Sequence, residues 1–81
     1  MHYVYIIFSR SLSKFYAGET SDLEIRLKGH NSNKNRFTGK VNDWVLVWKT
    51  EFPARTEALK FERKIKKRGI KRFLEDIDFK F

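Results

Sequence analysis

The chain has 81 residues, of which 18 are Lys or Arg and 10 are Asp or Glu, so its formal net charge is +8. This length supports a single domain over residues 1–81, and the excess of positive charge favours a polyanionic partner, nucleic acid before an anionic membrane. The sequence contains no cysteine, which excludes disulfide bonds and thiolate metal sites, so any metal ion must bind oxygen or imidazole ligands.

Three segments of the sequence predict strands. Residues 2–8 are β-branched and aromatic and predict a first strand that is buried on both faces. A polar turn separates this strand from a second, short one over residues 15–20, and the two should form a hairpin. We interpret the polar residues 31–43 as a loop and the ring-rich residues 44–51 as a third strand. These patterns predict a small, mostly antiparallel sheet.

Three further segments predict helices. Residues 21–24 match a capping box that starts at Ser21, which predicts a helix from there to about residues 29–31. Helical spacing also predicts a second helix over residues 55–67 and a short third one over residues 70–77. The element order is therefore β-β-α-β-α-α. We expect an α/β fold of the α+β type, in which helices flank a three-stranded sheet.

Chemically capable side chains occur near the first helix and the hairpin. Arg26 and His30 are four residues apart, on the side of the helix that also carries its apolar stripe, so both should project over the edge of the sheet. Taken singly, a helix Arg or His is usually solvated, and a strand Tyr usually belongs to the core. Tyr5 and Tyr16 change this interpretation, because neighbouring hairpin strands can bring two phenols close to that helix face.

Glu62 is the unusual carboxylate of the second predicted helix. At about 100° per residue it falls inside the apolar arc of the helix, where a carboxylate is costly unless it is paired, hydrogen-bonded or bound to metal. One alternative is an ion pair with Lys66, four residues later, which requires no function. The competing carboxylate, Glu57, lies on the flank of the helix and resembles an ordinary first-turn residue.

The segment over residues 60–72 is strongly basic. Eight of its thirteen residues are Lys or Arg, and Glu62 is its only acid. Such runs are usually solvated faces, but this one surrounds the semi-buried carboxylate, which suits a phosphate chain drawn toward a metal ion. The expected loop could add stacking through Phe37. The residues expected to contact nucleic acid are Arg36, Lys40, Arg63, Lys64, Lys66, Lys67, Arg68, Lys71 and Arg72.

These residues together resemble the GIY-YIG nuclease family. Residues 3–5 (Tyr-Val-Tyr) and 16–18 (Tyr-Ala-Gly) stand for the two triplets that name the family. Arg26 lies ten residues and His30 fourteen residues beyond the second Tyr, as in the family. The helix around Glu62 is similar to the one that supplies the family's metal-binding Glu. The resemblance covers almost the whole chain and is closest to short, stand-alone bacterial members related to the incision module of nucleotide excision repair.

The resemblance implies a metal-dependent endonuclease that hydrolyses DNA phosphodiester bonds, structure-selective in repair or recombination. It implies that Glu62 holds one divalent cation, Mg²⁺ or Mn²⁺, and that Arg26 stabilises the charge developing on the phosphate. A water would be deprotonated by a tyrosine whose pKa is lowered by the metal and Arg26, or by His30 acting through that tyrosine. Whether Tyr5 or Tyr16 faces the water is left open by the spacing.

Some positions of the sequence depart from the family pattern. Tyr3 replaces the first Gly, and Ala17 replaces the Ile of the second triplet. Leu74 stands near the position where many active members carry an Asn. The motif glycine Gly18 is retained, and we expect it to allow close backbone approach at the end of its strand.

Two other functions remain open from the sequence. The chain could be a nucleic-acid-binding module without useful catalysis, or a subunit of a larger DNA-processing complex with a protein partner. Branched or damaged DNA is the expected ligand, and RNA is an alternative. We expect a cytoplasmic protein with no membrane partner, because the longest apolar run is far too short for a span and no signal segment is evident.

Overall fold

The computed structural model describes residues 1–32 and 41–79. Its element order is the predicted β-β-α-β-α-α, and each boundary lies within two residues of its expected position, so the predicted fold class is confirmed. None of the helices in these ranges has the length and apolar composition needed to cross a bilayer. The elements are β1 (His2–Ser9), β2 (Lys14–Thr20), α1 (Leu23–His30), β3 (Trp44–Phe52), α2 (Arg55–Arg68) and α3 (Ile70–Asp76).

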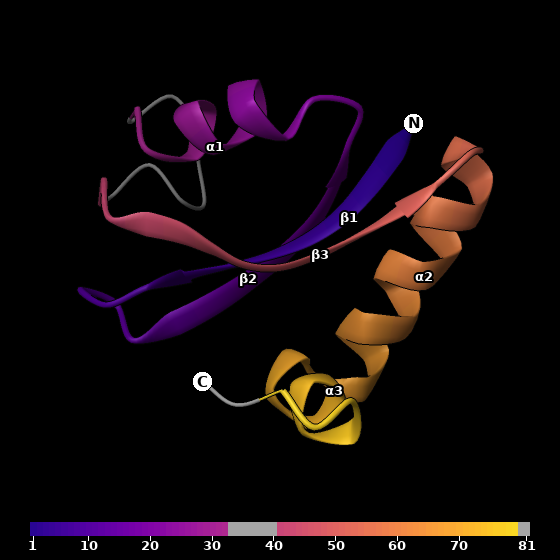
Figure 1. Cartoon of the computed structure of the whole chain (residues 1–81). Helices are drawn as coiled ribbons and strands as arrows, with labels where there is room; N and C mark the ends of the chain where they lie inside the picture. Colours follow the sequence, from indigo (N-terminus) through magenta and orange to yellow (C-terminus); the bar gives the residue numbers. More distant parts are fainter. Residues whose placement is uncertain (33–40, 80–81) are drawn as a thin grey trace.

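The three strands form one antiparallel sheet in the order β2-β1-β3, with β1 in the centre (Figure 1). Helix α1 lies on one side of this sheet, and α2 and α3 lie on the other. The four central residues of β1, Val4 to Ile7, are at most 1% exposed, so the prediction of a strand buried on both faces is confirmed. A bulge between Ile6 and Ile7 shifts the register against β3.

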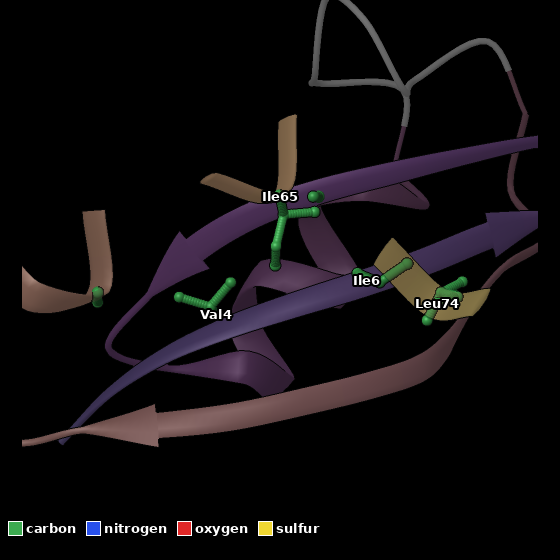
Figure 2. Close-up of a cluster of buried hydrophobic side chains, with 6 residues drawn as sticks. Val4, Ile6, Ile65 and Leu74 are labelled. Atoms are coloured by element: carbon green, nitrogen blue, oxygen red, sulfur yellow. The ribbon is translucent and has the colours of Figure 1, made fainter. Parts of the chain in front are cut away.

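The larger core lies between the sheet and helices α2 and α3. Val4 and Ile6 of β1 point toward Ile65 of α2 and Leu74 of α3 (Figure 2). Ile65 is 1% exposed and Leu74 is 4% exposed, so Leu74 is part of the hydrophobic core. Partly buried rings surround this core, namely Phe15, Trp48, Phe52, Phe61, Phe73 and Phe79.

A second, smaller core lies between the opposite face of the sheet and α1. Because side chains alternate along a strand, Tyr5 and Ile7 of β1 point to this face. They pack with Trp44 at the start of β3, and Leu23 and Leu27 of α1 cover them. This core carries the candidate catalytic side chains of the hairpin and of α1.

Helix α1 begins one residue later than the predicted capping box requires. Its N-cap is Asp22, whose Oδ1 accepts a hydrogen bond from the Ile25 backbone N–H at 3.1 Å, and the expected N-cap Ser21 is exposed. Thr20 Oγ1 accepts a hydrogen bond from the Asp22 N–H at 3.1 Å, which supports Asp22 in the extended conformation of a cap. The prediction that residue 21 caps the helix was therefore wrong.

Gly18 lies directly opposite Tyr5 in the β1–β2 register. The ring of Tyr5 passes so close to the Gly18 backbone that a Cβ there would lie 2.5 Å from the phenol oxygen and 2.7 Å from Cζ. No ordinary side chain fits in that space, so glycine at this position allows the phenol to lie flat against β2.

We predict that Gly18→Ala destabilises the protein by about 1–3 kcal/mol, because the Tyr5 ring must move out of its place. Gly29→Ala is the matched control, since a Cβ at Gly29 meets no atom within 4 Å. That substitution lies inside α1 and should stabilise the protein by up to about 1 kcal/mol. Urea unfolding followed by circular dichroism measures both changes. Equal effects of the two substitutions would contradict the close approach of Tyr5.

Candidate active site

Tyr5 is the centre of a hydrogen-bonded chain that joins β1 to α1. Arg26 Nε donates a hydrogen bond to the Tyr5 hydroxyl oxygen at 3.2 Å. The same oxygen lies 2.7 Å from Nε2 of His30. Since the guanidinium can only donate, the Tyr5 O–H is available to donate to a neutral His30. The expected proximity of Arg26, His30 and a hairpin phenol is present in the structure.

His30 is fully buried at the last residue of α1, at 0% exposure. Burial and the positive charge of Arg26 lower the pKa of His30 from 6.5 to about 4. The imidazole is therefore neutral at physiological pH and can accept a hydrogen bond at Nε2. Tyr16 contacts the imidazole edge-on, with the two ring centroids 5.1 Å apart.

The pKa of the Tyr5 phenol is raised above its ordinary value, chiefly because the group is buried. The hydrogen bond and the charge of Arg26 act in the opposite direction but do not outweigh burial. Tyr5 is consequently a protonated hydrogen-bond donor in the metal-free protein. Arg26 itself has a raised pKa, mainly through its hydrogen bond with Tyr5, and its side chain is exposed.

Tyr16 and Glu62 lie where α2 passes along the β2 side of the sheet. Lys66 Nζ of α2 lies 5.7 Å from the centroid of the Tyr16 ring and 3.8 Å from Oε2 of Glu62. The Glu62 side chain is 16% exposed, and its negative charge contributes to the raised pKa of Tyr5. The ion pair between Glu62 and Lys66, which the sequence offered as an alternative to a metal site, is thus formed. The same carboxylate also raises the pKa of Tyr5 through its charge.

Glu62 is the acidic side chain available to a metal ion at this cluster. Among the described residues, no group of three or more His, Asp or Glu side chains is arranged to hold a metal. Mg²⁺ commonly binds proteins through one or two carboxylates and completes its shell with waters and substrate phosphate oxygens. One partly exposed carboxylate close enough to Tyr5 to act on its pKa fits such a substrate-assisted site.

The basic residues grouped by the sequence separate in space. Lys66 lies beside Tyr16. Arg68 donates hydrogen bonds to both carboxylate oxygens of Asp76, at 2.8 and 3.0 Å, and is committed to that pair. The expected nucleic-acid contacts Arg36 and Lys40, with Phe37, lie outside the described residues. The remaining ones are exposed on α2 and α3, namely Arg63, Lys64, Lys67, Lys71 and Arg72.

Asn31 is a positioning residue that the sequence analysis did not single out. Directly after His30, its side chain forms two hydrogen bonds with the backbone of Trp44, at 2.8 and 3.0 Å. Nearby, Asp43 accepts hydrogen bonds from Ser9 Oγ and the Ser11 N–H, which lower its pKa to about 2. These contacts tie the end of α1 and the β1–β2 turn to β3. Asn is common at helix ends, and this preference was the only signal in the sequence.

We predict a pH dependence of stability that arises from His30. Its pKa is lowered to about 4 in the folded state, so as the pH falls through 6.5 the unfolded state takes up the proton first. Stability is therefore lost between these two pH values, by about 3 kcal/mol, and is fully present above them. In urea unfolding, the wild type should lose this stability between neutral pH and pH about 4, whereas His30→Gln lacks the titrating imidazole and should not. The free energy of unfolding of the wild type relative to His30→Gln should therefore fall by this amount over that range. A difference that is independent of pH would contradict a buried neutral imidazole.

Comparisons with known proteins identify the family of this chain. A sequence profile described as the GIY-YIG catalytic domain matches residues 1–73. A UPF0213 protein of Staphylococcus haemolyticus is 36% identical over 66 residues, which cover 80% of this chain and 79% of that protein. A UPF0213 protein of Halalkalibacterium halodurans is likewise 36% identical over 66 residues, which cover 80% of this chain and 69% of that protein.

A solved structure shares the fold. The solution NMR structure of a UPF0213 protein from Bacillus halodurans superimposes with a TM-score of 0.59 at 30% sequence identity. The match covers 98% of this chain and 84% of the other. The matched residues 1–73 include the hydrogen-bonded Arg26, Tyr5 and His30. They also include Tyr16 and Glu62. The chain therefore belongs to the GIY-YIG nuclease family.

Proposed function

We propose that this protein is a metal-dependent endonuclease that hydrolyses phosphodiester bonds in DNA. Nucleases of this family act on DNA and generally need a divalent metal ion. The observation that carries the proposal is the hydrogen-bonded chain of Arg26, Tyr5 and His30, with Tyr16 and Glu62 beside it. A hydrophobic core does not require this combination of groups in this arrangement.

Arg26 is the residue that binds the phosphate in this proposal. Its Nε is held by Tyr5, while the exposed guanidinium retains further N–H donors. These donors can bind two phosphate oxygens and stabilise the negative charge that grows on them during attack by water. Because Tyr5, itself hydrogen-bonded to His30, holds the guanidinium, little reorganisation is needed when the phosphate arrives.

We assign contact with the attacking water to Tyr16 and support of Arg26 to Tyr5. Tyr5 is 1% exposed and its hydroxyl is engaged by Arg26 and His30, so it has little access to water. Tyr16 is only partly buried, lies against His30 and stands beside Arg26. These positions support our assignment that its hydroxyl orients a water molecule against a phosphate on Arg26.

Glu62 is the proposed ligand of the metal ion. A Mg²⁺ or Mn²⁺ ion bound there would neutralise charge on the phosphate and on the leaving oxygen. Glu62 would exchange its loose pairing with Lys66, at 3.8 Å, for this ion. Lys66 would then remain beside Tyr16 as a further positive charge.

We predict that Glu62→Gln lowers the rate of nicking of supercoiled DNA at least about a hundredfold, because the amide keeps the shape and removes the charge that binds metal. Wild-type nicking should require Mg²⁺ or Mn²⁺ and stop with EDTA. Glu75→Gln, on the exposed surface of α3, is the control and should nick as the wild type does. Full activity of Glu62→Gln would refute the assigned metal ligand.

A nucleic-acid-binding module is the second candidate function. Two observations favour it: the Glu62–Lys66 pair already satisfies the carboxylate, and the segment near the buried Leu74 carries no Asn, which the resemblance leads us to expect there in active members. Binding of DNA by the wild type and by Glu62→Gln alike, without nicking by either in any metal, would establish this function instead.

We predict that the two tyrosines respond differently to removal of their hydroxyls. Tyr5→Phe removes the hydroxyl that contacts the buried His30 and holds Arg26, so it should lower both the nicking rate and the stability, the latter by about 1–3 kcal/mol. Tyr16→Phe should lower the nicking rate with stability nearly unchanged. Single-turnover nicking and urea unfolding separate these effects, and a Tyr16→Phe protein with wild-type nicking would contradict its assigned contact with water.

A further inference from the structure

Helix α2 presents two different surfaces. With about 100° between successive residues, Lys60, Lys64 and Lys67 lie largely opposite Glu62 and Lys66. The Glu62 side belongs to the candidate active site, where Lys66 lies over Tyr16. The other side borders a separate hollow. The basic segment of the sequence therefore does not form one continuous surface around Glu62.

The hollow on the far side of α2 has a volume of about 480 Å³, and two aromatic rings line part of it. The rings of Phe52 and Phe61 lie 5.3 Å apart between centroids, and both are partly exposed. Phe61 also packs against Trp48 at 6.2 Å and Phe73 at 5.8 Å, so its position is held by the core. We call this hollow the α2 groove; it is lined by Phe52, Glu57, Lys60, Phe61, Arg63, Lys64 and Lys67.

The walls of the α2 groove are strongly positive. Four cationic side chains face a single carboxylate, that of Glu57. Among the described residues, none of these four cations has an ion-pair partner, whereas Lys66 is paired with Glu62 and Arg68 with Asp76. The cations of the groove are therefore available to an anionic ligand.

We propose that the α2 groove is a second nucleic-acid site, which binds a single strand. Aromatic rings that are held in place and bordered by cations bind single strands through base stacking and phosphate contacts. Bases would stack on Phe52 and Phe61, and phosphates would contact Lys60, Lys64 and Lys67. A duplex offers its phosphates to the lysines but hides its bases from the rings, so the groove favours a single strand over a duplex.

The position of the groove has a consequence for the substrate. A strand bound there lies across α2 from Glu62, so a substrate with a single-stranded arm next to its duplex could occupy both sides of the helix. This consequence rests on the proposed nuclease function, whereas binding of a single strand by the groove does not. The test below therefore measures binding in EDTA, where no cutting is involved.

The experiment follows the binding of a fluorescent single-stranded oligonucleotide by anisotropy at several salt concentrations. The groove variant is Lys60→Gln/Lys64→Gln/Lys67→Gln, and the control variant is Arg10→Gln/Lys14→Gln/Lys28→Gln, which loses the same charge from exposed positions elsewhere. For the groove variant, the slope of log affinity against log salt should become shallower by about 2, at roughly 0.7 per lost phosphate contact. Equal losses in the two variants would overturn the proposal, because general charge would then explain the binding.

Stacking is tested with an oligonucleotide of the same length that carries abasic sugars. The wild type should bind it at least about fivefold more weakly than the base-bearing strand. Phe52→Leu should remove this preference, and if that variant does not fold, the abasic strand still tests the wild type. Equal binding of the two strands, or equal competition by polyglutamate at matched charge, would overturn the proposal, the latter in favour of an acidic protein segment.

Discussion

A hydroxyl group that is removed from water must be hydrogen-bonded, and the buried phenol of Tyr5 imposes this requirement on its surroundings. The partners come from α1, where Arg26 and His30 reach the same oxygen. The space comes from β2, where Gly18 offers no side chain. Since β1 is the central strand and is buried on both faces, the same strand that anchors the larger core also holds this polar group in place.

Electrostatics in this cluster depend on which groups are buried and which are exposed. The guanidinium of Arg26 remains partly in water and is therefore easily kept charged, while the His30 side chain is fully buried. Burial and the neighbouring cation both oppose a charge on the imidazole, so it acts as a neutral acceptor for Tyr5. A phosphate bound to Arg26 would meet a preorganised cation rather than one that must first be assembled.

Helix α2 links the two halves of the proposed nucleic-acid surface. Its buried residues Ala58 and Ile65 anchor it against the sheet. The residues between them then project to either side: Glu62 acts on the pKa of Tyr5, whereas Lys64 and Phe61 line the α2 groove. A single amphipathic helix thus separates a carboxylate site from an aromatic and cationic groove.

Much of this organisation could be predicted from the sequence because it depends on local patterns. The apolar run over residues 2–8 and the helical spacing over residues 55–67 indicated the correct elements, since periodicity follows directly from which faces are buried. Glu62 could be singled out as a candidate site residue because a carboxylate in the apolar arc of a helix is unusual. The cap of α1 was misplaced by one residue, since Ser21 and Asp22 are both good cap residues and the support from Thr20 is a matter of three-dimensional geometry.

The sequence by itself determined the class of elements, the positive charge and the ordered set of Tyr, Arg, His and Glu, because these depend on composition and spacing along one chain. Only the tertiary structure decided that Tyr5 is the buried, protonated centre of the cluster and that Tyr16 is the more accessible phenol. It also decided that the basic segment divides between two sides of α2, with Arg68 held by Asp76. The reason is that burial, hydrogen-bond partners and pKa arise from elements packed together in space, and spacing along the chain does not contain that information.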